Sequence, residues 1–384
     1  MRVLHVVSSF DSTLGYAEYY LAKKQLELGL DVKVICTNYQ AQRSFIRSSF
    51  VIEDNIPVVR IGNAGFLHAS VLLFSPVKLT KVIRDFSPEV IHCHGLLSPL
   101  SQAILLQKAH SYILVGDLIT GISPLVSRFL PAFKSFFNLW ISSRVEAFFA
   151  CCEAVEEFLL KDMGILSSKV RFIPLGADTE LFKPNKGERE RKRKTLGASE
   201  DDVVAIYSGK FLPEKRIHDL LVASKPVIEQ YGTFKLLLVG DGPESYKDQL
   251  KFLTKRLEID DNVMTVKMVH RTGLPSFYNA ADFAVWPGTF SISIIEAMAC
   301  GLPIVITQSK WTKHYFERMT GFSFKEGDVN QLSQLLSKLV SDPKLRKSMA
   351  KESRRLVDDK LNWDCINQQY LAVYNSCLGK CQYD

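Results

Sequence analysis

Long apolar runs are missing from this chain of 384 residues. No stretch approaches the roughly 18 consecutive apolar residues that a membrane-spanning helix needs, and the apolar start Met1–Val7 is too short for a signal peptide. We therefore expect the protein to stay in the cytosol. The eight cysteines form no Cys-x-x-Cys pair and mostly fall in apolar stretches. We interpret them as reduced core thiols, neither bridged nor bound to zinc.

Two other signatures are absent. Gly-x-Gly-x-x-Gly does not occur, which argues against a dinucleotide-binding fingerprint. The net charge is +7, and the basic run Lys186–Lys194 is interrupted by two glutamates and has no aromatic residue for base stacking. A solvated helix or linker explains this run better than a nucleic-acid surface, so no nucleic-acid partner is expected. An anionic substrate or an anionic lipid surface is compatible with the charge.

The chain does contain an alternation of strand-like and helix-like apolar segments, which predicts parallel sheets built from βαβ units. This pattern starts at Met1 and again near Val203, and 384 residues suit two domains better than one core. The polar segment Lys183–Gly187 is predicted to link them. The expected fold class is α/β, with two doubly wound Rossmann-like domains facing a cleft. Strands are expected over Arg2–Ser8, Asp31–Thr37, Val90–Cys93, Ser111–Val115, Ala147–Ala150, Val170–Pro174, Val203–Ser208, Lys235–Val239, Val263–Val266, Ala281–Trp286 and Pro303–Thr307.

The most informative segment is Ala281–Ile306, which is typical of a strand, a polar turn, a helix and a second strand. Gly301 suits the left-handed position after a helix, and Pro303 prevents the helix from continuing. Glu296 is thereby placed just past the carboxyl end of a strand, where open α/β sheets bind ligands. Helix N–H groups there attract phosphate, and a carboxylate accepts hydrogen bonds from two ribose hydroxyls. The alternative is an ordinary strand–helix–strand unit in which Glu296 only complements the helix dipole.

Two further strand ends carry glycine turns. The first expected strand of the second half is followed by Gly209, Lys210 and Lys215, and two cations on one loop suit a diphosphate. The next strand runs into Gly240-Asp241-Gly242, another tight turn. Taken alone, loop lysines and glycine turns are also ordinary surface features.

In order and spacing these motifs resemble the retaining glycosyltransferases of family 4, which have the two-domain GT-B fold. The resemblance covers nearly the whole chain and is closer in the second half than in the first. Its second-half segments are Gly209–Lys215, Gly240–Pro243, Ala280–Asp282 and Glu296–Pro303. Its first-half segments are Gly15–Glu18, Val90–Gly95, Phe148–Leu159 and Pro174–Asp178, and Trp363–Leu378 resembles the family's closing helix.

The resemblance implies an acceptor-binding domain over residues 1–182, a nucleotide-sugar-binding domain over 183–364, and a helix over 365–384 that packs back on the first domain. The implied reaction transfers a hexose from a nucleoside diphosphate sugar to an acceptor hydroxyl with retention at the anomeric carbon. The leaving diphosphate itself would accept the acceptor's proton. No cofactor is expected, and no metal either, because the chain has no Asp-x-Asp and lysines can supply the positive charge.

By similarity, Lys210 and Lys215 hold the diphosphate and Glu296 binds the ribose hydroxyls. Gly15 would keep the first loop thin enough for the diphosphate to approach. His94 or Asp117 would face the acceptor, although a strand-end histidine more often has a structural role. The remaining implied donor contacts are Gly209, Gly240 and Gly242 at the glycine turns, Met268 and His270 against the base, and Thr289, Phe290, Ser291, Ile292 and Ser293 around the sugar. We expect His270 to stack rather than to catalyse.

Four positions depart from the family pattern. Thr289 stands in place of the family's first acidic residue, and Gly116-Asp117 lies near the place of a family histidine. Tyr16 replaces the second loop glycine, and Leu175 replaces the hinge Asn. These departures leave the sugar open and favour one alternative, a non-catalytic relative that binds the nucleotide sugar without turnover. A sugar-nucleotide epimerase of the same fold is a second alternative, and it would need acid–base carboxylates and histidines in the cleft.

The acceptor is open between a lipid-linked and a water-soluble sugar. The segment Ile119–Leu139 is unusually apolar, which is typical of a surface helix that dips into a membrane. Such a helix would place the protein peripherally at the inner face of the membrane. A helix pair packed on the first sheet is favoured instead, because Pro124 and Pro131 break the segment.

Overall fold

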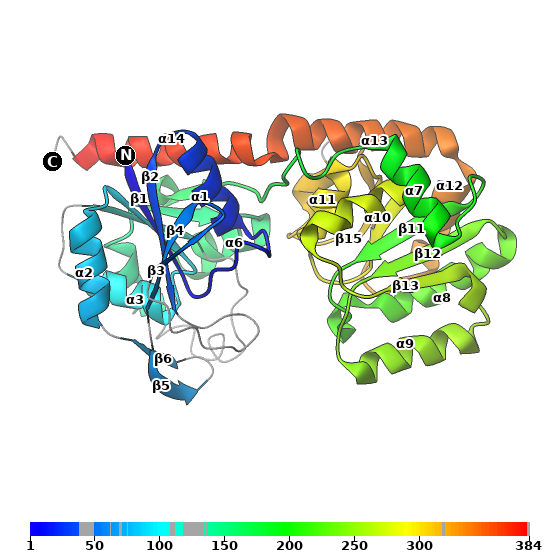
Figure 1. The fold of residues 1–384 in the computed structure, drawn as a ribbon, viewed down its shortest axis with the longest axis horizontal. Coiled ribbons are helices and arrows are strands. Elements are labelled where there is room, and N and C mark those ends of the chain that lie inside the picture. The colour runs from blue at the N-terminus through cyan, green and yellow to red at the C-terminus, as the bar shows by residue number, and fades with distance from the viewer. Residues whose placement is uncertain are drawn as a thin grey trace. The chain divides into compact units, whose positions relative to one another are not determined.

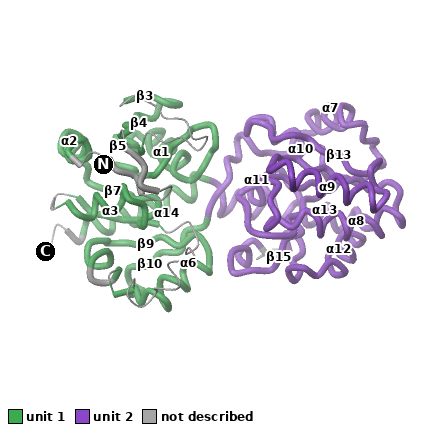
Figure 2. Tube along the Cα trace, turned by 90° about the horizontal axis from the view of Figure 1, so that it is seen from below, with its two compact units in different colours: residues 1–174, 363–384 green, residues 175–362 purple. Residues whose placement is uncertain are grey.

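The computed structural model describes residues 1–37, 50–61, 63–68, 71–74, 76–107, 112–117, 134–135, 137–316 and 319–381 (Figure 1). The chain divides into two compact units, coloured separately in Figure 2. The first unit comprises Met1–Pro174 and Trp363–Asp384, and the second comprises Leu175–Asn362. The change of unit at Pro174 comes earlier in the chain than the boundary predicted at residue 182. The end of the predicted linker is helical, because a helix begins at Lys186.

The first unit is built on a sheet of eight strands in the order β10-β9-β8-β7-β1-β2-β4-β3. All neighbours pair in parallel except β3 and β4, which are antiparallel. A separate hairpin is formed by β5 (Asn63–His68) and β6 (Val71–Phe74). The strands of the sheet are β1 (Arg2–Val7), β2 (Asp31–Thr37), β3 (Phe50–Glu53), β4 (Ile56–Ile61), β7 (Val90–His94), β8 (Ile113–Asp117), β9 (Ala147–Ala150) and β10 (Val170–Phe172).

Helices of the first unit are α1 (Ala17–Glu27), α2 (Pro76–Phe86), α3 (Pro99–Leu105), α6 (Glu153–Glu157) and α14 (Trp363–Cys381). Helix α14 lies beside α1 and is held there by an aromatic contact and an ion pair. Trp363 stacks on Tyr20 with ring centroids 5.0 Å apart, and Asp364 pairs with Lys24 at 2.9 Å. These residues are far apart in sequence, so the last helix completes the unit that the first strand begins.

The second unit is built on a six-stranded parallel sheet in the order β13-β12-β11-β14-β15-β16. Its strands are β11 (Val203–Ser208), β12 (Phe234–Val239), β13 (Val263–Val266), β14 (Phe283–Trp286), β15 (Ile304–Thr307) and β16 (Gly321–Phe324). Every residue of β11 is buried, as expected of a central strand covered on both faces. The strand order of the second sheet is that of a Rossmann-like domain.

Helices of the second unit are α7 (Lys186–Leu196), α8 (Ile217–Gln230), α9 (Glu244–Arg256), α10 (Leu274–Ala280), α11 (Ser293–Ala299), α12 (Val329–Ser341) and α13 (Pro343–Leu356). Both units are thus doubly wound α/β domains, as predicted. In the described part of the chain, no helix combines the length and the apolar character needed to cross a bilayer.

Candidate active site

The candidate donor residues of the second unit lie at the point where its sheet changes its direction of winding. Strands β12 and β13 follow on one side of β11, whereas β14, β15 and β16 lie on the other side. Open α/β sheets bind ligands outside the carboxyl ends of the strands at this switch point. Lys210 and Lys215 follow β11, and Thr289 and Glu296 follow β14. The residues predicted to hold the phosphates, ribose and sugar are therefore carried by the two strands that flank the switch point.

Gly240 and Gly242 hold the loops after β11 and β12 together. A Cβ added at Gly240 would lie 1.9 Å from the carbonyl oxygen of Gly209, and one added at Gly242 would lie 1.9 Å from that of Phe211. Phe211 N also donates to the Asp241 carbonyl at 2.8 Å. The backbone approach explains both glycines without a ligand, although they were predicted as donor contacts. This close approach fixes the geometry of the loop that carries Lys210 and Lys215.

The Lys215 ammonium joins the loop after β11 to the loop after β14. Its Nζ donates to the carbonyl oxygens of Thr289 at 3.1 Å and Phe290 at 2.8 Å. Thr289 N donates in return to the Glu214 carbonyl at 3.2 Å. Burial lowers the pKa of Lys215, and the nearby charge of Lys210 acts in the same direction. Lys210 is exposed on the same loop, so the two cations stand at one edge of the sheet.

Glu296 lies in the first turn of α11 and is only 7% exposed. Burial raises the pKa of its carboxyl to about 7, and the charge of Arg271 and the nearby Tyr278 hydroxyl oppose that rise. The Tyr278 hydroxyl also bonds Ser208 Oγ at 2.7 Å and donates to the Ser293 carbonyl at 3.3 Å. Tyr278 therefore links the end of β11 to the start of α11, and it fixes the surroundings of the carboxylate.

The turn from Thr289 to Ser293 leads directly into α11. Ser291 Oγ and Ser293 Oγ are 2.9 Å apart, and Ile294 N donates to the Ser291 carbonyl at 3.1 Å. Thr289 is exposed, and Phe290, Ser291 and Ile292 are partly exposed. Helix α11 runs only from Ser293 to Ala299, so any dipole at its start is that of a short helix. The turn itself, held by Lys215, is the better-defined feature.

Met268 and His270 follow the edge strand β13. Met268 is 57% exposed, and His270 is exposed as well. His270 Nδ1 lies 2.9 Å from Thr272 Oγ1 and accepts from Thr272 N, so its ring is oriented by the short turn that follows it. Both side chains present accessible surface of the kind that stacks on a flat ring, and neither is built into the core.

In the first unit the winding changes direction between β1 and β7. Gly15, with φ of 63°, lies in the loop after β1, and His94 is the last residue of β7. His94 and Asp117 are register partners on the adjacent strands β7 and β8, which is why their side chains meet. His94 Nδ1 lies 2.9 Å from Asp117 Oδ2. The two residues predicted to face the acceptor are therefore bonded to each other, and both are about 5% exposed.

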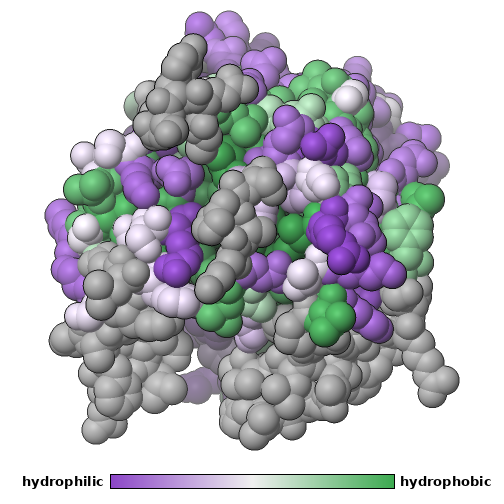
Figure 3. Space-filling model, turned by 90° about the vertical axis from the view of Figure 1, so that its left-hand side faces the viewer, coloured by the Kyte–Doolittle hydropathy of each residue, from purple (hydrophilic) through white to green (hydrophobic). Residues whose placement is uncertain are grey.

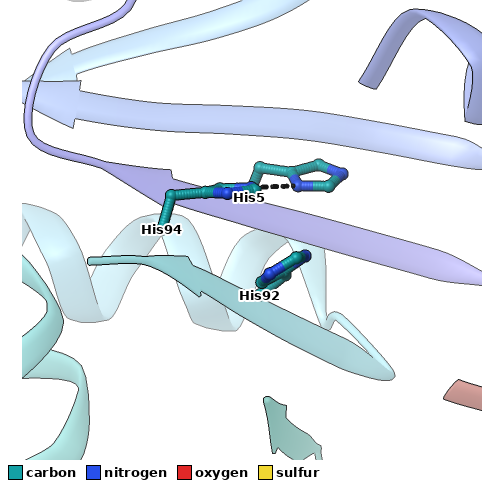
Figure 4. A group of neighbouring side chains, drawn as sticks. All are labelled: His5, His92 and His94. Atoms are coloured by element: carbon teal, nitrogen blue, oxygen red, sulfur yellow. Dashed lines mark hydrogen bonds between the residues drawn. The ribbon is translucent and has the colours of Figure 1, made fainter. Parts of the chain in front are cut away.

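His94 belongs to a larger buried set of polar side chains from β1, β7, β8, α1 and α14, part of which Figure 4 shows. We call it the His94 network, and its members are Gln25, His5, His94, Asp117, His92 and Tyr374. His94 Nε2 lies 2.9 Å from His5 Nδ1, and His5 Nε2 lies 2.9 Å from Gln25 Oε1. On the other side, His92 Nε2 lies 3.5 Å from Asp117 Oδ2, and His92 Nδ1 lies 2.7 Å from the Tyr374 hydroxyl.

The charges in this network are uneven. Burial lowers the pKa of His92 to about 4, and the charge of His94 adds to that shift. Burial likewise lowers the pKa of His5 well below its ordinary value. Burial alone would raise the pKa of Asp117, but His94 and His92 hold it below its ordinary range. His5 and His92 are therefore neutral at neutral pH, and Asp117 is ionised.

His5, His92 and His94 are also the one group, among the residues that the structure describes, whose ligand atoms come within 4.8 Å of one another as a metal site would require. The rings of His92 and His94 have their centroids 4.1 Å apart and are tilted by 31° relative to each other. Metal ions bind in the plane of an imidazole ring, along the nitrogen lone pair. Both His94 nitrogens already face protein partners, so a cation would have to displace a shared proton.

Four members of the His94 network were not predicted as site residues from the sequence, namely His5, Gln25, His92 and Tyr374. A signal for one of them existed, because His92 and His94 alternate on one face of a strand and His5 pairs with His92 in register. No local pattern indicates Gln25 or Tyr374, since Tyr374 lies 282 residues from its partner. In the second unit Tyr278 was missed for the same reason.

A pocket of about 450 Å³ lies elsewhere in the second unit. It is lined by residues at the amino ends of β14 and β15, opposite the switch point. The guanidinium groups of Arg189 and Arg346 on its wall already donate to backbone carbonyls of Ala281 and Val340. We therefore do not assign a substrate to it.

Two family descriptions match this chain. "Glycosyltransferase Family 4" matches residues 18–181, and "Glycosyl transferases group 1" matches residues 188–356. The two matches do not overlap, and each falls mainly within one of the two halves of the chain.

Two relatives and one solved structure illustrate the similarity. The chain is 28% identical over 228 residues to the D-inositol 3-phosphate glycosyltransferase of Kribbella flavida, covering 56% of this chain and 52% of that protein. It is 25% identical over 396 residues to the capsular polysaccharide biosynthesis glycosyltransferase CapM of Staphylococcus aureus, covering 98% and 97%. The chain spans about half the length of the first curated relatives that it matches.

Anabaena HepE, solved in complex with UDP and glucose, has a TM-score of 0.74 with this chain at 20% identity, over 98% of this chain and 100% of that one. At this identity the likeness concerns the fold. Both halves, the strand order and the family matches lead to one assignment. The chain belongs to glycosyltransferase family 4 and has the GT-B fold.

Proposed function

We propose that this chain transfers a hexose from a nucleoside diphosphate sugar to an acceptor hydroxyl with retention at the anomeric carbon. The observation that carries the proposal is the arrangement of Lys215, the Thr289–Ser293 turn and Glu296 around the switch point of the second sheet. Cations, a carboxylate and backbone N–H groups at one strand edge suit phosphates, a ribose and a sugar, respectively. The HepE structure, which holds UDP and glucose, supports a donor of this class.

In this proposal the donor is bound by residues 183–364. Lys210 and Lys215 stabilise the charge that develops on the diphosphate as the glycosidic bond breaks. Glu296 accepts hydrogen bonds from the ribose hydroxyls, and Met268 and His270 pack against the base. The leaving diphosphate takes the proton of the acceptor hydroxyl, so no protein carboxylate has to act as a nucleophile.

The acceptor is assigned in the proposal to residues 1–182, at the loops after β1 and β7. The prediction of a membrane-bound acceptor was based on the segment Ile119–Leu139, which lies almost wholly outside the described residues. On the face drawn in Figure 3, hydrophobic and hydrophilic side chains of the described residues are interspersed. Peripheral membrane contact therefore stays a prediction, as does the choice between a lipid-linked and a soluble acceptor.

A second candidate is a relative that binds the nucleotide sugar without turnover. It is favoured by Thr289, which is exposed at the position where the family has an acidic residue that contacts the sugar. An epimerase would need histidines and carboxylates that are available for acid–base chemistry. It is less well supported, because the buried histidines and Asp117 are hydrogen-bonded to one another.

The deciding experiment incubates the purified chain with a panel of uridine and guanosine diphosphate sugars, with and without a membrane extract, and measures nucleoside diphosphate release. Release that requires the extract, with label transferred to it, supports the transferase. Donor binding without release supports the non-catalytic relative. Interconversion of the sugar without any acceptor supports the epimerase.

Donor affinity should depend on pH through Glu296. The carboxylate accepts two ribose hydrogen bonds only when it is ionised, and its pKa is raised to about 7 by burial. Affinity should therefore rise as the pH increases from about 6 to about 8, by about tenfold in total. Isothermal titration with the best donor of the panel measures this dependence. Glu296→Gln should bind weakly and lose the pH dependence, whereas Glu244→Gln on α9 should behave like the wild type.

A further inference from the structure

The pocket of about 450 Å³ in the second unit differs from the candidate active site in its place in the fold. It is lined by residues that precede β14 and β15, by the start of α7 and by the first two turns of α13, whereas the donor residues follow the carboxyl ends of β11 and β14. A volume of this size is typical of a small-molecule site. The charged lining residues are four cations, Lys186, Arg189, Arg346 and Lys347, and one acid, Asp282.

The carboxylate and amide oxygens of the pocket wall are already used within the protein. Asp282 Oδ1 accepts from Arg189 Nη2 at 2.7 Å, and Asp282 Oδ2 accepts from Val204 N at 2.7 Å. Asn279 Oδ1 accepts from Asn185 N at 2.7 Å, and Asn185 Oδ1 caps α7. Arg189 thereby neutralises the one acid. The wall therefore favours a ligand that accepts hydrogen bonds over one that donates them.

Several donors of the wall are not used in this way. Arg346 donates through Nη1 to two backbone carbonyls at the end of α12. Within the described ranges, its Nε and Nη2 make no hydrogen bond, and the Lys347 ammonium has no ion-pair partner. The Lys186 ammonium lies 3.8 Å from a Glu190 carboxylate oxygen and is largely exposed. The nearby Asp342 carboxylate instead caps α13.

The free donors suit a phosphate. Nε and Nη2 of an arginine lie on one edge of the guanidinium and together bind two oxygens of a phosphate or carboxylate. A phosphate group carries a charge of about −1.5 to −2 at pH 7, which matches several cations better than a single carboxylate does. We propose that this pocket binds a small phosphorylated metabolite as an effector, separate from the donor. The phosphate lies on Arg346 and Lys347, and the rest of the molecule packs on the apolar part of the wall, formed by Pro184, Leu302 and Pro343.

Helix α13 connects the proposed phosphate site to α11. Arg346, Ala350 and Arg354 are spaced by four residues, so they lie along one face of α13. The first two line the pocket. Arg354 Nη1 donates at 2.7 Å to the carbonyl oxygen of Ala299, the last residue of α11. One helix face therefore carries both the guanidinium that would hold the phosphate and a bond to the end of α11.

Helix α11 leads from the pocket to the donor site. Cys300, Gly301 and Leu302, which follow it directly, line the pocket, and Glu296 lies in its first turn. All seven residues from Ser293 to Ala299 are buried, so the helix moves only together with its surroundings. A ligand that holds α13 against the end of α11 therefore orders the Glu296 carboxylate before the donor binds, which lowers the cost of binding. We expect donor affinity to rise when the pocket is occupied.

The binding test titrates the full chain calorimetrically with inorganic phosphate, glycerol 3-phosphate and a hexose phosphate. Since phosphate also suits the donor site, the titrations are repeated with Lys215→Met. Binding of at least one probe should persist in Lys215→Met and weaken by about tenfold in Lys347→Gln, which removes one charge-assisted bond. The control is Lys344→Gln, which changes an exposed lysine of the same helix outside the pocket, and it should bind like the wild type.

Two results overturn the anion site. One is the absence of binding for all three probes. The other is binding that is lost in Lys215→Met and retained in Lys347→Gln, which would place the phosphate among the donor residues. Arg346→Gln should reduce binding further than Lys347→Gln, and its urea denaturation midpoint shows whether the bonds of Arg346 to the end of α12 are needed for folding. Lys347 is exposed and makes no such bonds, so Lys347→Gln decides the test if Arg346→Gln is unstable.

The effector role is tested by titrating the best donor of the nucleotide-sugar panel with and without a saturating amount of the probe that binds. The donor dissociation constant should fall by about fivefold in the wild type, and by less in Lys347→Gln at the same probe concentration. An unchanged donor dissociation constant overturns the effector role. This part rests on the proposed function, through Glu296, whereas the anion site does not. A chain that binds the probes but no nucleotide sugar therefore contradicts the proposed function, while the binding results still decide the anion site.

Discussion

Replacing Lys215 with Met should lower kcat/KM for the nucleotide sugar by about two to three orders of magnitude. The ammonium donates to the carbonyls of Thr289 and Phe290, and each charge-assisted hydrogen bond contributes about 1.5–3 kcal/mol. In the proposed reaction the same charge faces the diphosphate, so the change removes both the support of the turn and the stabilisation of the leaving group. Methionine keeps the apolar stem, which separates the loss of charge from a loss of packing.

The measurement is steady-state release of the nucleoside diphosphate, accompanied by donor titration. Lys215→Arg should retain part of the activity, because a cation remains near the turn. Lys225→Met, which removes a lysine paired with Glu229 on α8, is the matched control and should be close to wild type. Wild-type kinetics in Lys215→Met would remove this residue from the site and, with it, the main support for the proposed donor position.

Replacing Gly240 with Ala should destabilise the second unit by more than about 3 kcal/mol, at the upper end of what overpacking costs. The new methyl group would lie 1.9 Å from the Gly209 carbonyl oxygen and 2.7 Å from the Phe211 ring, and a backbone oxygen cannot rotate away as a side chain can. The loops after β11 and β12 would have to separate, and Lys210 and Lys215 would move with them.

Urea denaturation followed by tryptophan fluorescence measures the loss, because Trp286 is buried in β14 of the same unit. Gly232→Ala is the control, since a Cβ there meets nothing within 4 Å. That variant should change stability by less than about 1 kcal/mol. An equal denaturation midpoint for the two variants would show that the loops tolerate the methyl group.

The inner strands could be predicted from the sequence because they are mostly apolar. Asp31–Thr37, Ala147–Ala150 and Val203–Ser208 have the predicted bounds, since a strand covered on both faces is rich in apolar residues. The antiparallel pair β3 and β4 was missed, because Phe50–Glu53 is partly exposed. Strand β16 begins at Gly321 and was missed too, as glycine weakens a strand pattern.

Of the candidate site, the sequence could predict only the residues that come shortly after the end of a predicted strand. Glu296 and Lys215 could be placed in that way, and they lie where the switch-point rule puts them. The rule gave no hint that Lys215 bonds the carbonyls of the turn, since that contact joins residues 74 and 75 positions apart. The pairing of His94 with Asp117 depends on strand register, which no local pattern fixes.

The order in which the chain is synthesised has a consequence for the first unit. Its sheet is encoded before Pro174, yet α14, which supplies Tyr374 and Trp363, is translated only after the whole of Leu175–Asn362. The second unit is one continuous stretch and has all its parts on the ribosome before α14 emerges. Until α14 is made, the first unit is incomplete, and His92 lacks the hydroxyl of Tyr374 as its partner. A released chain truncated after Asn362 should therefore resist protease in the second unit while the first is still cleaved.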